Sequence, residues 1–423
     1  MLLEFSFSNY KSIRQPVLFS MLAGSDTAHE ECMNAFGGQK ILKSAVVYGA
    51  NGSGKSNFIN ALAFARNLVL NSIRYQPGKG IDEQPFKLDG YHTPSMYRMQ
   101  LEIEGIRYLY QFSLQDMLVK DEYLYYFPNK KQTKIFERHG ESFSAGRSFR
   151  GKFDTCRDVL KPNRLLLSCA ANFSSVQTVA KLYGFFRDDL VIYFSNAPSN
   201  WMDYSLRTMA THPDIKEAVI TFMQELGMGL QDIEVKIEKH KPSQEELPPL
   251  PFLAPEFRER LLEGEINRID AKVVYKDFKT DLMSEESNGV RKLFAFLCPF
   301  LDIMKQGKIL VCDELEVGLH ESIVYGLLRM FLNHKLKTFP QLIFTTHDTG
   351  ILNLDLFRRD QIWFTELRED RSTDLYSLAE IKRVRKDENW AKGYIRGKYG
   401  AIPMLNLDLA KILSDKASIS SDI

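Results

Sequence analysis

A group of glycine, lysine and serine residues follows a short apolar run near residue 50. The stretch SAVVYGANGSGKSNFINAL, residues 44–62, contains the P-loop pattern Gly49-x-x-x-x-Gly54-Lys55-Ser56. In such a loop, between a strand and a helix, backbone N–H groups and the helix N-terminus converge on an anion. Lys55 would reach the β- and γ-phosphates of a nucleotide, and the Ser56 hydroxyl would ligate Mg²⁺. The alternative is a glycine-rich turn that binds no ligand.

Two other apolar segments end in polar residues. Residues 309–312 precede Asp313 and Glu314, and residues 342–344 precede the sequence Thr-Thr-His that ends at His347. Buried parallel strands present their C-terminal ends at the edge where ligands bind. Asp313 then suits a water-mediated hold on Mg²⁺, Glu314 can align or deprotonate an attacking water, and His347 can touch the γ-phosphate. The alternatives are solvated strand ends and a histidine without a ligand.

A second amide-rich helix start is predicted near residue 287. In SEESNGVRKLFAFL, apolar residues recur at helical spacing from Val290 to Leu297, so Ser287 and Gly289 fall at the helix N-terminus. Taken alone, this pattern is a helix cap that needs no ligand.

The remaining elements must position these groups. The run 45–47 reads as a buried strand, residues 96–138 as an antiparallel lobe, and residues 157–230 as helical. Residues 240–257 carry five prolines and read as an exposed connection, and the alternating segments on either side of it could pair as strands.

Composition excludes few functions. The 423 residues are 44% hydrophobic and 26% charged, as is usual for a soluble protein, and a net charge of +1 argues neither for nor against nucleic acid. Five scattered cysteines without a CxxC pair suit reduced thiols and a cytoplasmic location. The N-terminus resembles a strand more than a signal peptide, and no apolar stretch approaches a membrane span.

The order of these motifs resembles the ABC ATPase class, in its SMC-like and OLD-like branch. More closely, NYKSI, PFKLDGYHTPSMYRMQLEIEG, ESNGVRKLF, CDELEVGLH, FTTHD and YIRGKYGAIP resemble the RloA-type AAA ATPases of bacterial anti-phage operons, of the PARIS or RloA/RloB kind. The resemblance covers about residues 2–403.

The resemblance implies a fold and its domains. The fold would be an α/β ABC-type P-loop NTPase head with a mixed central sheet, an antiparallel β lobe and a helical insert. The implied units are an N-terminal ATPase half (1–156), an insert (157–282), a C-terminal ATPase half (283–403) and a tail (404–423).

The resemblance also implies a composite ATP site. In that class two heads meet head to tail, so the signature residues Ser287, Asn288 and Gly289 of one copy would face the phosphate-binding loop of another. The chain would then act as a homodimer or a higher assembly of dimers. Asn288 and Val290 depart from the usual signature of the class. His320 matches a loop that could cross the dimer, and Gln84 and Gln100 are candidates for the Q-loop glutamine.

The resemblance also assigns roles within the site. Catalysis would fall to Glu314, His347 and Lys55, with Mg²⁺ held by Ser56 and Asp313. The nucleotide would contact Gly49, Asn51, Gly52, Ser53, Gly54, Lys55, Ser56 and Asn57.

Three functions follow from the resemblance. In the first, the ATPase scaffolds, restrains or triggers a separately encoded nuclease or toxin of TOPRIM-like or RloB-like fold during phage infection. In the second, the chain is an SMC-like DNA-repair or DNA-processing ATPase, against which the absence of a long coiled-coil insertion argues. In the third it is itself a nuclease of the OLD kind, but only 76 residues (423 minus 347) follow His347.

A basic and aromatic stretch near the C-terminus bears on nucleic acid as a partner. In EIKRVRKDENWAKGYIRGKYGAIP, seven lysines and arginines are interleaved with Trp390, Tyr394 and Tyr399, which would suit phosphate contacts and base stacking. The alternative is a structural or protein-docking role, because a run of charges is usually a solvated face. Under the nucleic-acid hypothesis, charge reversal at Arg383 and Arg385 would abolish binding.

Overall fold

Two large sheets, with helices between and around them, form the part of the chain that the computed structural model describes: residues 1–26, 29–195, 200–241, 266–352, 355–382, 384–385 and 388–403. The central sheet has six strands in the order β11 (Leu190–Phe194), β15 (Ile309–Asp313), β16 (Gln341–Thr345), β5 (Ser44–Gly49), β17 (Ile362–Leu367) and β18 (Thr373–Ser377). The first five are parallel and β18 is antiparallel to β17, which confirms the predicted mixed central sheet.

Helices cover both faces of this sheet, so alternate residues of each strand are buried on opposite sides. Val47 and Val311 face α1 (Lys55–Asn71) and share one hydrophobic cluster with Phe58. Val46 and Leu310 belong to a second cluster, which includes residues of α7 (Asn288–Gln306) and α8 (Glu321–Asn333). Every residue of β5 is buried, as expected of a central parallel strand.

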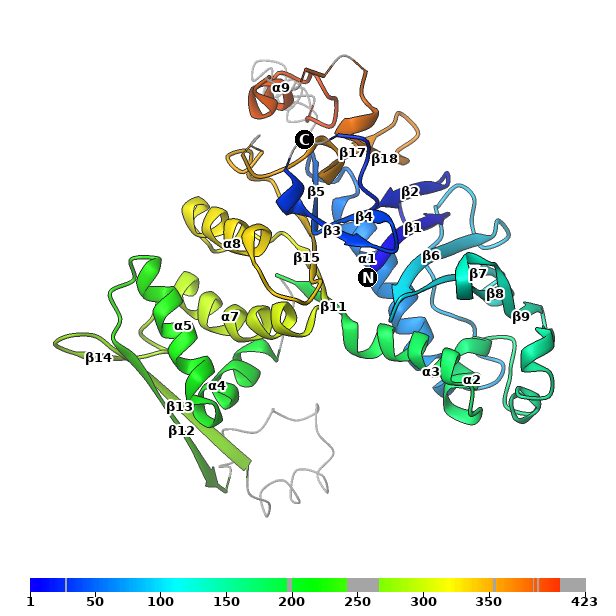
Figure 1. Cartoon of the computed structure of the whole chain (residues 1–423), viewed down its shortest axis with the longest axis horizontal. Helices are drawn as coiled ribbons and strands as arrows, with labels where there is room; N and C mark the ends of the chain where they lie inside the picture. Colours follow the sequence, from blue (N-terminus) through cyan, green and yellow to red (C-terminus); the bar gives the residue numbers. More distant parts are fainter. Residues whose placement is uncertain are drawn as a thin grey trace, which may run out of the picture.

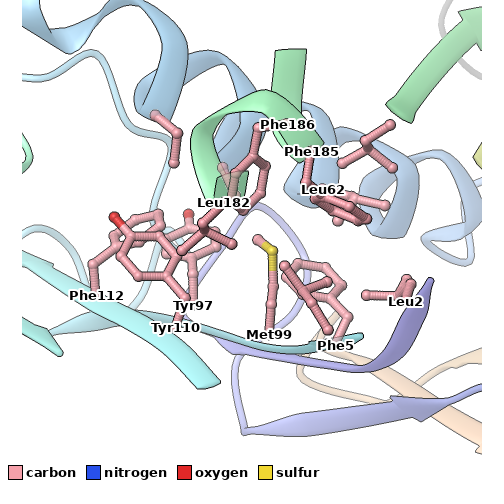
Figure 2. Close-up of a cluster of buried hydrophobic side chains, with 14 of the residues drawn as sticks. Leu2, Phe5, Leu62, Tyr97, Met99, Tyr110, Phe112, Leu182, Phe185 and Phe186 are labelled. Atoms are coloured by element: carbon pink, nitrogen blue, oxygen red, sulfur yellow. The ribbon is translucent and has the colours of Figure 1, made fainter. Parts of the chain in front are cut away.

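The second sheet is the antiparallel lobe, as predicted. Its strands lie in the order β10 (Ser142–Ala145), β9 (Thr133–His139), β8 (Leu118–Tyr126), β7 (Ile106–Gln115), β6 (Ser95–Ile103), β1 (Leu2–Ser8) and β2 (Val17–Ser20). Beside β1 lies the hairpin of β3 (Met33–Phe36) and β4 (Gln39–Leu42) (Figure 1). Figure 2 shows how Phe5, Met99 and Tyr110 of the lobe pack with Leu62 of α1 and Phe186. The phosphate-loop helix is therefore anchored to the lobe by apolar contact.

The segment predicted to be helical contains one strand. Helices α2 (Leu166–Phe173), α3 (Gln177–Gly184), α4 (Trp201–Thr211) and α5 (Pro213–Glu225) are present, but β11 lies between α3 and α4 and forms the edge of the central sheet. Helices dominate the segment as predicted, but the short apolar run LVIYF carries no signal that separates a buried strand from a helix turn, so the prediction missed β11.

The two alternating segments pair as predicted. Strands β12 (Asp232–His240) and β13 (Ile266–Val274) run antiparallel and form a three-stranded sheet with β14 (Lys279–Asp281). They lie beside α4 and α5, away from the lobe (Figure 1). Most of the proline-rich connection and the tail 404–423 lie outside the described residues. None of the helices in the described ranges has the length and apolar character that crossing a membrane needs.

Candidate functional site

The glycine-rich loop connects β5 directly to α1, as the pattern predicts. Gly54 precedes the helix with a φ of 109°, and a Cβ at Gly49 would lie 2.3 Å from Thr365 Oγ1. Side chains at these two positions would therefore strain or displace the loop. The loop stays close to the backbone of β17, and the helix N-terminus points into a cavity of about 350 Å³.

Lys55 lies at the inner wall of this cavity. Its ammonium group donates to the carbonyl oxygens of Gly49 at 2.8 Å and Ala50 at 3.1 Å. Burial lowers the pKa of Lys55 to about 8, and the carboxylates of Glu314 and Asp313 oppose this shift. No carboxylate among the described residues forms an ion pair with Lys55, and a phosphate would supply that negative charge.

The end of β15 places the two predicted carboxylates opposite this loop. Thr345 Oγ1 on β16 donates to Asp313 Oδ1 at 2.7 Å and accepts from the Glu314 N–H at 2.8 Å. The Ser195 hydroxyl lies 2.7 Å from the carbonyl oxygens of both residues. Glu314 has a φ of 53°, which is rare for a residue with a side chain and places a strained backbone at this edge.

His347 faces Glu314 across the mouth of the cavity. Its Nε2 lies 3.9 Å from Glu314 Oε1, and its backbone N–H donates to Glu316 Oε1 at 2.6 Å. Burial and the charge of Lys55 lower the pKa of His347, although the nearby carboxylates oppose them. A neutral imidazole at pH 7 follows. The cavity is lined by the following residues: Asn51, Gly52, Gly54, Lys55, Ser56, Asn57, Glu314 and His347.

This arrangement fits Mg²⁺ by the chemistry of its donors. The Ser56 hydroxyl and the Asp313 carboxylate supply the oxygen ligands that Mg²⁺ prefers, at the same end of the sheet as Lys55. Ser53, although predicted to contact nucleotide, turns its hydroxyl to Thr365 Oγ1 at 2.7 Å. Its side chain is buried, so it supports the shape of the loop.

Ser12 and Thr373, which sequence analysis did not single out as site residues, brace the loop from far along the chain. Asn57 Nδ2 donates to Ser12 Oγ at 2.7 Å, and Thr373 Oγ1 lies 2.7 Å from the same oxygen. Thr373 also donates to the Ser53 carbonyl at 2.8 Å. Ser12 belongs to the NYKSI motif, which contributed only to the family resemblance. That motif was the one feature of the sequence that could have pointed to Ser12 as part of the site.

The predicted signature residues do not line the cavity of their own chain. Ser287 caps α7 by accepting from the Val290 N–H at 3.3 Å, and Asn288 is exposed with its Oδ1 bonded to Arg291. Gly289 lies against the chain after β15, because a Cβ there would be 3.0 Å from the Gly318 carbonyl oxygen. The helix start is therefore accessible to another molecule.

The loop that follows β15 is fixed to α7. Lys292 Nζ donates to the Val317 carbonyl and lies 3.5 Å from the Leu315 carbonyl. His320 caps α8 by accepting from the Ser322 N–H at 3.2 Å. Neither Q-loop candidate reaches the cavity: the Gln84 side chain is exposed, and Gln100 donates to Glu4 on the lobe.

The aromatic residues near the C-terminus are part of the core. Trp390, Tyr394 and Tyr399 are 4%, 8% and 3% exposed, and Tyr394 stacks on Phe364 of β17 at 5.5 Å between ring centroids. Trp390 and Tyr394 belong to α9 (Trp390–Ile395). The burial of these rings agrees with a structural role and removes the support that they gave to the hypothesis of base stacking. Arg383, one of the two residues proposed for charge reversal, lies outside the described residues.

One family model matches more than half of the chain, including the glycine-rich loop. The model of the family described as "AAA domain, putative AbiEii toxin, Type IV TA system" matches residues 44–156 and 212–353. The crystal structure of an SmcHead bound to the C-winged helix domain of ScpA is 15% identical, with a TM-score of 0.42 over 89% of this chain and 97% of that one. The SMC head domain from Thermotoga maritima is 13% identical, with a TM-score of 0.41 over 89% and 98%. No curated protein sequence matches the chain.

Proposed function

Because this chain belongs to the AAA-domain family of the AbiEii toxin type, we propose that it hydrolyses ATP with Mg²⁺ at a site shared between two copies of itself. The proposal rests on one observation: some of the predicted site residues line a single cavity, and the others lie outside it. The phosphate loop, Glu314 and His347 line one cavity, while Ser287, Asn288 and Gly289 lie outside it at an accessible helix start. A second copy would bring its helix start to the cavity.

The residues of the cavity have separate roles in this reaction. The loop N–H groups and Lys55 bind the β- and γ-phosphates, and Lys55 leaves the carbonyls of Gly49 and Ala50 to do so. Ser56 and Asp313 would hold Mg²⁺, which neutralises charge on the phosphates when bound. Glu314 aligns or deprotonates the attacking water, and the neutral imidazole of His347 donates to the γ-phosphate.

Such a site favours a switch over a fast catalyst. Phosphoryl transfer depends on positioning and charge neutralisation, so a site completed by another copy works only while the copies are docked. ATP holds the two copies together and hydrolysis releases them.

The switch controls a separately encoded effector in anti-phage defence, a nuclease or toxin of TOPRIM-like or RloB-like fold. The family description, which names a putative AbiEii toxin of a type IV TA system, supports a defence role. The five cysteines are buried free thiols, which supports action in the reducing cytoplasm. The SMC-like alternative, direct action on nucleic acid, loses its support from the C-terminal aromatic residues because these are buried.

The test is the solution mass of the Glu314→Gln variant with and without Mg-ATP. This variant should bind ATP without completing hydrolysis, so its mass should rise to that of a dimer or a larger even assembly when ATP is added. The Lys55→Ala variant is the matched control and should not change. A Glu314→Gln chain whose mass ignores ATP would contradict the shared site. Co-purification with the product of the neighbouring gene tests the effector separately.

A further inference from the structure

A cavity lined by the β3–β4 hairpin and by residues of the antiparallel lobe lies far from the phosphate loop. It measures about 710 Å³, within the usual range of ligand pockets, and opens between the β3–β4 hairpin and the ends of the lobe strands. Phe36 at the hairpin tip approaches the β6–β7 turn, since a Cβ at Gly105 would lie 3.8 Å from Phe36 Cζ. Leu3 at the start of β1 lines the cavity, whereas Ser12 beyond its other end contacts the phosphate loop. Strand β1, with seven residues, spans about 20 Å and separates the cavity from the phosphate loop.

One wall of this cavity carries a pre-positioned arginine. The guanidinium carbon of Arg107 lies 3.9 Å from the centroid of the Phe127 ring, a close cation–π contact that fixes the plane of the guanidinium. The hydrogen bonds and ion pairs among the described residues include none from the Arg107 side chain. Its N–H groups are therefore available to a ligand.

The charges around the cavity favour an anion. Lys130 lines the same wall, is exposed, and takes part in no ion pair with a described residue. The opposing charge on the wall is Glu102, which is 7% exposed and accepts from the Gly105 N–H. The N-terminal amine of Met1 donates to the backbone carbonyl of Glu102 at 2.6 Å, and burial lowers the pKa of this amine although the charge of Glu102 opposes the shift. Arg107 and Lys130 thus face the cavity, and neither forms an ion pair with a described residue.

We propose that this cavity binds a nucleotide, with its phosphate on Arg107 and Lys130 and its base against Phe36. A stacked guanidinium binds phosphate with two parallel N–H bonds, and a half-buried phenylalanine offers a face for a base. The nucleotide comes either from the free pool or from the end of a single strand. This site is separate from the proposed ATPase site and does not depend on it.

The test uses the Lys55→Ala chain, in which the phosphate loop is disabled. Fluorescent AMP and a short 5′-phosphorylated oligothymidylate are the probes, titrated to about 1 mM at low salt. We expect saturable binding of at least one probe. Adding Arg107→Ala should weaken it by about tenfold or more, and Arg107→Lys, which keeps the charge but loses the planar fork, should weaken it less. Arg98→Ala, which removes an exposed arginine of β6 outside the cavity, is the matched control and should bind as the Lys55→Ala parent does.

The outcomes separate the sources and the two proposals. Binding of AMP identifies a free nucleotide as the ligand, and binding of the oligonucleotide alone identifies a strand end. Absence of binding by both probes, or equal affinity of the Arg107→Ala and Arg98→Ala chains, would overturn the proposal. Equal melting temperatures of these two chains exclude a folding defect. Arg107→Ala in the otherwise unchanged chain should leave ATP hydrolysis intact, so failure here leaves the ATPase proposal standing.

Discussion

Thr345 Oγ1 on β16 donates a hydrogen bond to Asp313 Oδ1 on β15, at 2.7 Å. The same hydroxyl accepts from the Glu314 N–H at 2.8 Å, and Thr345 is fully buried. One hydroxyl group therefore fixes the orientation of both carboxylate residues. Neighbouring parallel strands place polar groups at one edge, but the angle at which a carboxylate points depends on contacts such as this one.

Replacing Thr345 by valine tests this arrangement. The two side chains have nearly the same shape, so the change removes the hydroxyl and leaves the Asp313 oxygen and the Glu314 N–H without this partner. We expect a loss of about 1–3 kcal/mol in the free energy of unfolding and a lower kcat for ATP. Thr345→Ser keeps the hydroxyl and should stay close to the unchanged chain in kcat. Equal kcat values for the valine and serine variants would show that the hydroxyl does not position the carboxylates.

The lowered pKa of Lys55 predicts pH-dependent nucleotide binding. In the free chain the pKa is about 8, chiefly because of burial, and bound phosphates would raise it because they favour the charged form. ATP binding should therefore take up a proton above pH 8, and its Kd should rise about tenfold per pH unit there. Calorimetry in buffers of different ionisation enthalpy measures this uptake. A Kd that is constant between pH 7 and 9 would contradict the prediction.

The lowered pKa of His347 predicts how kcat/KM for ATP changes on the acid side of its pH profile. Its pKa is lowered, so the imidazole stays neutral until the pH falls below its usual value of about 6.5. Because kcat/KM reports groups of the free enzyme, it should decline only below that pH. His347→Gln should lower kcat by about 10²–10³ and should remove this decline. A decline that persists in the glutamine variant belongs to another group.

The hydrogen bonds of Lys292 predict that α7 holds the loop that follows β15 in place. Lys292→Met keeps the buried stem but removes the ammonium that the Val317 carbonyl accepts from. We expect a loss of about 1–3 kcal/mol in the free energy of unfolding and weaker ATP-dependent self-association. Lys305→Met, at the exposed end of the same helix, is the matched control and should be nearly neutral. If both variants behave alike, the contact does not order the loop.

Local patterns predicted the elements that carry the candidate site. The phosphate loop, the strands before Asp313 and His347, and the helix that Ser287 caps each depend on residues within about ten positions of one another. The antiparallel lobe was predicted for the same reason, since its hairpins join neighbouring segments.

Contacts between distant segments escaped the sequence patterns. Thr373 and Ser12 meet at the phosphate loop although 361 positions separate them, and β11 joins β15 across more than a hundred residues. Tyr394 and Tyr399 resembled a stacking surface in the sequence, yet the fold buries them against β17. Alternation of charge and aromatic residues does not reveal which face of a segment meets the core.

The central claim is that one copy completes the ATP site of another, and a mixing experiment tests it most directly. A Lys55→Ala chain has no working phosphate loop and a Ser287→Arg chain has no working helix start, so each alone should be inactive. In an equal mixture of dimers about half are mixed, and each mixed dimer has one site built from intact parts, so about a quarter of the ATPase activity should return. Inactivity of a mixture whose mixed dimers are present by mass would contradict the shared site.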